Sequence, residues 1–371
     1  MAQTVDHVIV FSQENHTTDN YFSSMRAWGA NVATGWPVQP NPPAHDAPHT
    51  RAAYAKWLHA QRTGAPTPAV HTQFDTAAVL PYYAYLAATG AFLENHCSGF
   101  GTNSTPNHLL IVGGQSPTLR NPPRNQPQPE WDMPSLPGHT QDHGLTWKVY
   151  AGSSGYPVSF YTQLIGSANI TGSDQIVADA AAGTLPGVCL VEPNYGTSSE
   201  ENPQNIALGE QFAASIINAV IQGPAWDKTA LILTYDEHGG YYDHVPPPAA
   251  IPPDSIGPTL VPGENGFDGF ARYGFRVPFA LVSPWSRRNY VSHRLFDHTS
   301  ILKLVETKWN LPALTFRDAN ANAMLDMLDL HRPAFAEPPR LATPIATADP
   351  SSLTCSTTGP GTIPPPGSVT G

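Results

Sequence analysis

The sequence predicts an α/β fold with a mostly parallel central sheet and helices on both of its faces. Short, continuous apolar runs alternate with longer segments in which apolar residues recur every three or four positions. Runs of the first kind are typical of strands buried on both sides, and the second pattern is typical of amphipathic helices. Polar clusters directly follow several of the apolar runs. Because ligands bind at the carboxyl edge of open parallel sheets, this placement predicts a functional site there.

Six apolar runs are predicted as strands. In chain order they are His7–Phe11, Leu109–Val112, Leu145–Tyr150, Val188–Val191, Ala230–Thr234 and Val277–Val282. A helix is predicted over Asn205–Gln222, where apolar residues recur at helical spacing. A second helix is predicted to begin near Asp297, and this start makes His298 a supporting residue rather than a catalyst.

Two long segments interrupt the alternation of strands and helices. Residues 29–68 are rich in Pro, Ala and His, and residues 246–269 are rich in Pro and Gly. Long ordered loops often border the pocket of an enzyme, and both segments are predicted to do so. We expect a single domain over residues 1–349, followed by a disordered Pro/Ser/Thr/Gly-rich tail over residues 350–371.

Composition narrows the classes of partner. The 371 residues include 29 acidic and 18 basic side chains, which give a formal net charge of −11. No cluster of Lys or Arg is available to bind a run of phosphates, so nucleic acid is not expected as a partner. No apolar segment approaches the ~18 residues needed to cross a bilayer, so stable membrane insertion is not expected. The oligomeric state stays open.

The N-terminus and the cysteines carry no catalytic signal. The first residues run into a predicted strand without the charged and apolar regions of a signal peptide. Cys97, Cys189 and Cys355 lie far apart, unlike the cysteines of zinc ribbons or redox motifs. One disulfide is allowed but none is required, and we interpret all three as small structural residues.

The stretch TYDEHGG, Thr234–Gly240, places Asp236 and Glu237 at the end of a predicted strand. Glu14 and Asn15 follow the first predicted strand in the same way, so parallel strands would bring the two pairs together. Carboxylates crowded without Lys or Arg repel each other, and a cation relieves this repulsion. Oxygen ligands favour Mg²⁺, Ca²⁺ or Mn²⁺, and Zn²⁺ with added His ligands stays open. Singly, each pair is equally well explained as a helix cap or a strand end.

The segment NSTPNH, residues 103–108, contains a hydroxyl with no evident structural role. Thr105 and Pro106 predict a helix start, with Thr105 as the N-cap. Ser104 would then face the free N–H groups and the positive end of the helix dipole, a setting that favours an anion. A nearby metal would favour loss of its proton further, which makes Ser104 a candidate nucleophile for attack on phosphorus.

Fifteen histidines offer too many possible proton donors for spacing alone to choose among them. A single His in a loop is more often a hydrogen-bonding residue than a catalyst. By position, those that could protonate a leaving group or bind phosphate are His16, His49, His71, His143, His238, His244 and His298.

Five motifs, in order between about residues 5 and 310, resemble the phosphoesterase family that contains bacterial and plant non-specific phospholipases C and certain acid phosphatases. They are HVIVFSQENHTTDNYF, GTNSTPNH, the segment from GEQF to TALILTYDEHGGYYDHVPPP, GFRVPFALVSPWSR and FDHTSILKLVE. The resemblance implies an alkaline-phosphatase-like three-layer α/β sandwich. It also implies a phosphoric ester hydrolase with a covalent phosphoserine intermediate on Ser104 and with a divalent metal held by Glu14, Asn15, Asp236 and Glu237.

The same resemblance implies a small-molecule or phospholipid phosphate ester as substrate, either a diester or a monoester. Members are frequently exported, so a secreted or periplasmic location is expected. The family places a His after its first loop, and the similar segment DAPHTRAAYAKWL makes His49 the first choice for contact with the phosphate. His143, near the third predicted strand, is the second choice.

Three positions depart from the family pattern. His16 stands in place of Arg, Asn20 in place of His, and Asn202 in place of the His of a DHP motif. The change at Asn202 leaves the identity of the general acid open. A phosphate- or metal-binding protein that has lost catalysis is therefore one alternative, and a sulfatase or phosphonate hydrolase on a related sandwich is another.

Overall fold

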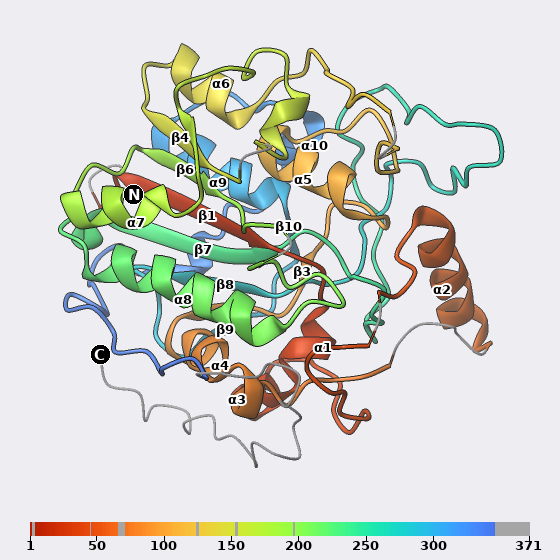
Figure 1. Ribbon diagram of the computed structural model, residues 1–371, viewed down its shortest axis with the longest axis horizontal. Coiled ribbons are helices and arrows are strands. Elements are labelled where there is room, and N and C mark those ends of the chain that lie inside the picture. Colours follow the sequence, from red (N-terminus) through yellow and green to blue (C-terminus); the bar gives the residue numbers. More distant parts are fainter. Residues whose placement is uncertain are drawn as a thin grey trace.

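The computed structural model describes residues 1, 4–44, 46–65, 71–123, 126–152, 155–195 and 197–345. Its centre is an eight-stranded sheet in the order β5-β4-β6-β1-β7-β8-β2-β9 (Figure 1). These strands are β1 His7–Gln13, β2 Ala91–Leu93, β4 Trp147–Tyr150, β5 Ile170–Thr171, β6 Val188–Val191, β7 Thr229–Tyr235, β8 Phe279–Val282 and β9 Tyr290–Ser292. A separate parallel pair joins β3, His96–Cys97, to β10, Phe296–Asp297.

The large sheet is mostly parallel. Within the described residues, only β8 runs against its neighbours, β7 and β2. The register pairs Phe11 of β1 with Val191 of β6 on one side and with Leu233 of β7 on the other. The residues that follow these three strands therefore emerge together at the carboxyl edge of the sheet, and the predicted α/β class is confirmed.

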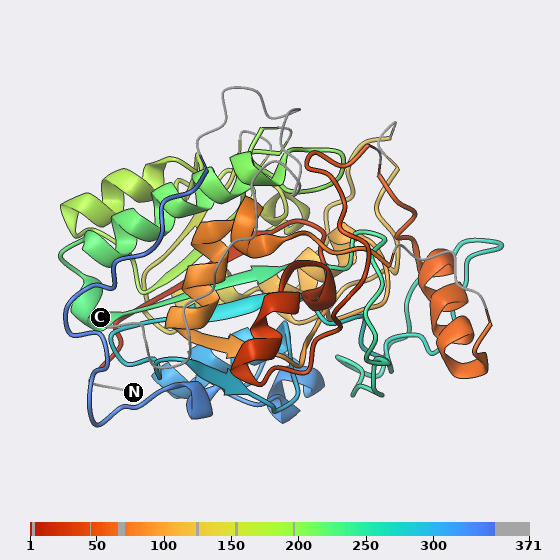
Figure 2. The same cartoon turned by 90° about the horizontal axis from the view of Figure 1, so that it is seen from below.

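Helices cover both faces of the sheet, as Figures 1 and 2 show. One face carries α4 Pro81–Thr89, α7 Gln175–Ala182 and α8 Ile206–Gln222, and the other carries α5 Ser104–Gly113, α6 Leu136–Asp142 and α9 Thr299–Trp309. Along β1, Ile9 and Phe11 enter the first core while Val8 and Val10 enter the second. Burial on both faces explains why the strand is one continuous apolar run.

Further helices and turns complete the described chain. They are α1 Thr18–Tyr21, α2 Arg51–Thr63, α3 Thr76–Val79 and α10 Phe316–Asn320, with 3₁₀ turns η1 Ser23–Trp28, η2 Val158–Phe160, η3 Trp226–Lys228 and η4 Leu325–Met327. The predicted helices near Asn205 and Asp297 are confirmed, since Asn205 caps α8 and Asp297 directly precedes His298, the N-cap of α9. No helix in the described part of the chain has the length and apolar character to cross a membrane.

One predicted strand is wrong. Residues Leu109–Val112 belong to α5, and every residue of this helix is buried. A helix that is apolar on all sides loses the three-to-four periodicity that separates helix from strand. The helix also begins earlier than expected, because Asn103 is its N-cap and Thr105 is already inside it.

The two long segments differ in structure. Residues 29–68 were predicted as a loop, but they contain the helix α2. Residues 246–269 contain no helix or strand and form an extended loop, as predicted. Figure 2 shows α2 and this loop extending past the carboxyl edge of the sheet.

Part of the predicted organisation falls outside the described residues. The tail over residues 350–371, the expected boundary at residue 349 and Cys355 all lie there. The other two cysteines, Cys97 and Cys189, are free and buried.

Candidate active site

The ends of β1 and β7 bring the two predicted polar pairs together. Glu14 and Asn15 follow β1, and Asp236 and Glu237 follow β7, its parallel neighbour. The backbone N–H of Asn15 donates to Oδ1 of Asp236 over 3.3 Å. A Cβ added at Gly239, which has a φ of 56°, would collide with the carbonyl oxygen of Asn15. The glycine after the acidic pair is therefore needed for the close approach of the two loops.

Helix α5 carries Ser104 to the same edge. Ser104 is buried in the first turn, and its Oγ lies 3.3 Å from Oε2 of Glu14 and 3.3 Å from Oδ1 of Asn15. A hydrogen bond from Ser104 also favours the ionised form of Asp236. The structure therefore brings Ser104 together with three of the four predicted metal ligands, at a helix N-terminus that favours negative charge.

His108 belongs to this group, although the sequence analysis did not select it. Its Nε2 lies 2.8 Å from Oε1 of Glu14 and 3.5 Å from Oδ2 of Asp236, and its Nδ1 lies 3.4 Å from Oε2 of Glu192 at the end of β6. Burial opposes its positive charge, but the three carboxylates raise the pKa of His108 well above its ordinary value. The available signal was its spacing, since residues four apart share one face of a helix.

The residues of this group fit a divalent metal. Ligand atoms of Glu14, His108 and Asp236 all lie within 4.8 Å of one another. Within the described residues, Oδ2 of Asp236 is buried without a hydrogen-bond donor, and burial together with Glu14 raises the pKa of Asp236 strongly. A carboxylate in such a place either takes a proton or binds a cation. Carboxylate, amide and hydroxyl oxygens suit a hard cation, and the imidazole would also suit zinc. We call Ser104, Glu14, Asn15, His108 and Asp236 the site cluster.

Glu237 lies beside the site cluster but faces two histidines. Its Oε1 lies 3.7 Å from Nε2 of His49, and its Oε2 lies 2.6 Å from Nδ1 of His238. Burial opposes its ionisation, but His49 and His238 hold the pKa of Glu237 below its ordinary value. Conversely, burial opposes the charge of His49, while Glu237 and then Asp46 raise its pKa. His49 is thus linked to the acidic pair, and its contact with phosphate stays a prediction.

A second acid, Glu201, lies near His49. Ligand atoms of Asp46, His49 and Glu201 fall within 4.8 Å of one another. Burial, followed by the charges of Glu14 and Asp46, raises the pKa of Glu201 to about 7. Glu201 was not among the predicted site residues. Near neutral pH, Glu201 is able both to hold and to release a proton.

Glu200 anchors the segment that carries Glu201. Its carboxylate accepts hydrogen bonds from the hydroxyl groups of Tyr21, Tyr83 and Tyr235 at 2.6, 2.7 and 2.7 Å. Burial raises the pKa of Glu200 to about 7, although the three hydroxyl groups act in the opposite direction. These contacts fix the backbone of Glu201 beside the site.

The three positions that depart from the family pattern all make contacts around the same segment. His16 stacks on Tyr21, its Nε2 lies 3.0 Å from the carbonyl oxygen of Glu200, and its Nδ1 lies 2.8 Å from Oδ1 of Asn20. Burial lowers the pKa of His16 to about 4, so it is neutral. Asn202 exchanges hydrogen bonds with the hydroxyl group of Tyr241 at 2.8 and 3.0 Å. All three residues therefore have structural contacts here.

His143 is not brought to the site. It caps the end of α6, just before β4, and its Nδ1 lies 2.8 Å from the carbonyl oxygen of His139. Because β4 runs parallel to β6 and β1, the segment before β4 lies at the amino edge of the sheet, opposite the site. His298, in contrast, lies beneath the site, where its Nε2 is 3.0 Å from the carbonyl oxygen of Tyr235, in the supporting role that was predicted.

A cavity of about 760 Å³ opens beside Ser104. Its lining combines aromatic and aliphatic side chains with carboxylates and, among the residues that the structure describes, includes no Lys or Arg. The residues are Glu14, Ser104, Thr105, Asn121, Pro122, Pro127, Gln128, Glu130, Tyr156, Ser159, Phe160, Ile165, Tyr195 and Glu201. A cavity of this size accommodates a small organic ester next to the serine hydroxyl.

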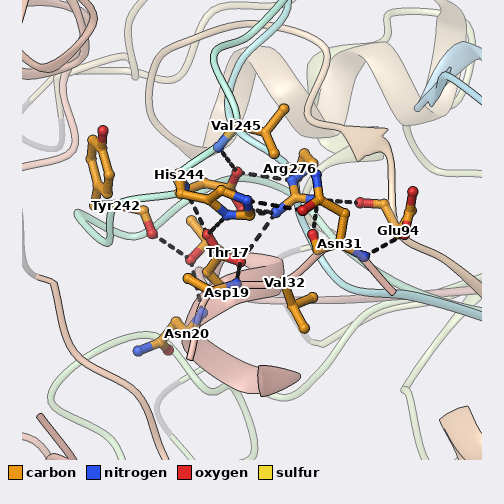
Figure 3. Close-up of polar contacts among 12 residues, drawn as sticks. Thr17, Asp19, Asn20, Asn31, Val32, Glu94, Tyr242, His244, Val245 and Arg276 are labelled. Atoms are coloured by element: carbon orange, nitrogen blue, oxygen red, sulfur yellow. Dashed lines mark hydrogen bonds and ion pairs between the residues drawn. The ribbon is translucent and has the colours of Figure 1, made fainter. Parts of the chain in front are cut away.

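A second buried charge cluster, which we call the arginine cluster, consists of Asp19, Asp243, His244 and Arg276 (Figure 3). Arg276 Nε lies 2.8 Å from Oδ1 of Asp243, and its Nη2 lies 3.1 Å from Oδ1 of Asp19. His244 Nδ1 lies 2.6 Å from Oδ2 of Asp19. Although its acids and His244 have the spacing of metal ligands, Arg276 already supplies the positive charge.

Comparisons with known proteins identify the family to which the chain is similar. The model of the Phosphoesterase family matches residues 42–312. Over 95% of the chain, the sequence is 27% identical to Phospholipase C A of Mycobacterium tuberculosis and covers 82% of that protein. It is 26% identical to Non-hemolytic phospholipase C of Pseudomonas aeruginosa over 83% of the chain and 54% of that protein. It is 28% identical to Non-specific phospholipase C1 of Arabidopsis thaliana, over 65% of the chain and 48% of that protein.

Two solved structures show partial similarity to this chain. A protein in the alkaline phosphatase superfamily from Vibrio parahaemolyticus gives a TM-score of 0.45 at 10% identity, over 86% of this chain and 70% of that one. Murine ectonucleotide pyrophosphatase/phosphodiesterase 5 gives a TM-score of 0.49 at 12% identity, over 87% of this chain and 100% of that one.

Proposed function

This chain belongs to the Phosphoesterase family, and we propose that it is a metal-dependent phospholipase C-type hydrolase whose nucleophile is Ser104. One observation carries the proposal: Oγ of Ser104 lies 3.3 Å from both Glu14 and Asn15, at a helix N-terminus and beside the acid Asp236. The names of the relatives, which are phospholipases C, support a phospholipid diester as the substrate.

The site cluster, together with Glu237, would hold the metal. When bound, the metal supplies positive charge that favours the ionised serine and balances the charge on the phosphoryl oxygens. Glu14 and Asn15 orient the Ser104 hydroxyl, and the N-terminus of α5 directs N–H groups toward the same place. These groups prepare Ser104 for attack on phosphorus.

Two covalent steps follow from this arrangement. In the first, Ser104 gives up its proton to solvent, its Oγ bonds to phosphorus, and the bond to the leaving alcohol breaks, so that the alcohol takes the electron pair and a proton. Glu201 or His49 supplies the proton of the alcohol, since both lie at the mouth of the site and both have a raised pKa. In the second step, water attacks phosphorus and gives a proton to the same group, while Ser104 leaves with its electron pair and regains its own proton from solvent.

The test is hydrolysis of a chromogenic phosphate monoester and of a choline-linked diester, before and after chelation. We expect chelation to abolish turnover reversibly, and Ser104→Ala to lower kcat/KM by about 10³-fold or more while metal binding persists. Thr105→Ala, which removes the neighbouring hydroxyl, is the matched control and should retain activity within about tenfold. Acid quenching should trap phosphate on Ser104. Full activity of Ser104→Ala, or of the chelated protein, contradicts the proposal.

Asn202 favours a second function, a protein that binds phosphate or metal without turnover. The side chain at this position is committed to Tyr241 and offers no imidazole to the site. Turnover of neither ester with any divalent cation, combined with saturable binding of inorganic phosphate, would support the binding protein. Hydrolysis of sulfate or phosphonate esters in preference to both substrates would identify the other alternative.

A further inference from the structure

The loop over residues 246–269, which we call the apolar loop, presents a group of apolar side chains to solvent. Five of its side chains are between 38% and 72% exposed, namely Ile251, Ile256, Leu260, Val261 and Phe267. Single exposed apolar residues are ordinary on soluble proteins, but several on one projecting loop indicate an interaction surface. Figures 1 and 2 both show this loop, in teal, beyond the carboxyl edge of the sheet.

The apolar loop is held in place by polar contacts at its stem. The N–H of Thr259 donates to the carbonyl oxygen of Pro117 over 2.8 Å, and Arg120 donates to the carbonyl oxygen of Thr259 over 3.0 Å. On the other side, Arg51 of α2 donates to the carbonyl oxygens of Phe267 and Gly269. The exposed side chains are therefore displayed by an anchored loop.

The acidic residues of the apolar loop are mostly neutralised. Glu264 pairs with Arg120 at 2.6 Å, and Asp268 pairs with Arg272. The carboxylate of Asp254 accepts a hydrogen bond from the N–H of Ile256 over 2.6 Å. Little uncompensated negative charge accompanies the apolar side chains, which lowers the cost of moving the loop into a less polar environment.

The apolar loop is continuous with one wall of the cavity beside Ser104. Its contacts at Pro117 and Arg120 lead directly to Asn121 and Pro122, which line that cavity. Ile165, another lining residue, is itself 48% exposed. Apolar side chains therefore occur both on the loop and at the cavity it adjoins.

We propose that the apolar loop docks the protein on a zwitterionic phospholipid surface and turns the cavity toward the lipid headgroups. The proposal rests on the proposed function, which makes a phospholipid the substrate. Insertion of the five side chains at the boundary of headgroups and acyl chains removes them from water without any membrane-spanning segment. The net charge of −11 and the absence of Lys and Arg from the apolar loop disfavour an anionic surface, which basic segments normally recognise.

The docking test uses vesicles of phosphatidylcholine and a Ser104→Ala background, so that the lipid stays intact. The loop variant carries Ile256→Ser, Leu260→Ser and Val261→Ser. The control is Leu325→Ser, which is 43% exposed in η4. Since η4 lies beside the residues that follow the antiparallel strand β8, this control is at the opposite edge of the sheet.

We expect the Ser104→Ala protein to co-sediment with the vesicles, the loop variant to lose about tenfold or more in partition coefficient, and Leu325→Ser to bind unchanged. With Ser104 intact, the loop variant should hydrolyse a soluble ester within about twofold of the parent protein. Unchanged partition overturns the proposal. An equal loss of soluble-ester activity also overturns it, because the loop would then shape the cavity instead.

The remaining outcomes separate docking from catalysis. A dimer that becomes a monomer in the loop variant, measured by sedimentation velocity, assigns the loop to contact between copies and overturns docking. Loop-dependent vesicle binding without hydrolysis of any ester supports docking and overturns the proposed function. Hydrolysis of soluble esters without vesicle binding supports the proposed function and overturns docking.

Discussion

Two buried charge clusters in this protein take their acidic residues from the same two sequence motifs. ENHTTDNYF supplies Glu14 and Asn15 to the site cluster and Asp19 to the arginine cluster. YDEHGGYYDH supplies Asp236 to the site cluster and both Asp243 and His244 to the arginine cluster. The clusters thus share residue types, burial and origin, and they differ in what balances their negative charge.

This difference distinguishes a cluster that stabilises the fold from a cluster suited to bind a cation. In the arginine cluster, Arg276 is a permanent cation, and each carboxylate oxygen of Asp19 and Asp243 has a hydrogen-bond partner. In the site cluster, Oδ2 of Asp236 has no donor among the described residues, and the positive charge comes from the titratable His108. A satisfied cluster stabilises the fold, whereas an unsatisfied one leaves room for an exchangeable cation.

The largest expected effect comes from Asp236→Asn. The amide keeps the size of the side chain but removes one of the negative charges that would hold the metal, so kcat/KM should fall by about 10³-fold or more. Because burial and Glu14 already make ionisation of Asp236 unfavourable, the metal-free variant should be at least as stable as the wild type. Urea unfolding of the chelated proteins measures this. A variant that is both active and destabilised would reverse the comparison between the clusters.

Arg276→Gln, in contrast to Asp236→Asn, should destabilise the folded protein. It leaves the buried carboxylates of Asp19 and Asp243 without their cation, which should lower the free energy of unfolding by about 3–5 kcal/mol. Thermal or urea denaturation measures the loss. Adding Asp19→Asn and Asp243→Asn should recover a large part of the stability, because the uncompensated charges are then gone. If the single variant is as stable as the wild type, the arginine cluster does not hold the fold together.

A smaller effect concerns pH. Burial raises the pKa of Glu200 to about 7, above the ordinary value of 4.5. Between pH 4.5 and about pH 7, the folded protein therefore keeps a proton on Glu200 that the unfolded protein has lost. The free energy of unfolding should therefore be highest near the lower pH and fall as pH rises through about 7, by about 3 kcal/mol at 1.36 kcal/mol per pKa unit.

Glu200→Gln should remove this pH dependence, measured as the difference between the urea-unfolding curves of the two metal-free proteins from pH 5 to pH 8. Tyr83→Phe is the companion variant. It deletes one of the hydrogen bonds that lower the pKa of Glu200, so the decline should extend to higher pH. Parallel curves for wild type and Glu200→Gln would show that Glu200 does not titrate in this window.

Local patterns were sufficient to predict the centre of the site. The apolar runs before Glu14 and Asp236 identify strands. In open parallel sheets, ligands bind at the carboxyl ends of the strands, which is where both residues lie. The helix start at NSTPNH added Ser104. These residues meet because β1 and β7 are adjacent and in register, which the sequence implied but did not prove.

The residues that were missed depend on which strands are neighbours. His108 meets Glu192 only because β6 lies beside β1, and this order is set by tertiary packing. The raised pKa of Glu201 likewise arises from burial and from charges far away in the sequence. The strand prediction at Leu109–Val112 failed because a fully buried helix has no polar face. The predicted export and the identity of the metal stay predictions.

The smallest expected effect separates the two histidines that the sequence proposed. Proximity to a strand in sequence does not say which end of the strand a residue occupies, and His143 lies at the amino edge of the sheet. His143→Ala should therefore leave kcat and KM within about twofold, whereas His49→Ala, which removes the partner of Glu237, should lower kcat by about 10–100-fold. Burial opposes the charge of His49, but Glu237 and Asp46 raise its pKa above the ordinary value, so loss of His49 should also change the pH profile of kcat. Equal losses in both variants would mean that the active site includes the opposite edge of the sheet, which the parallel register does not allow.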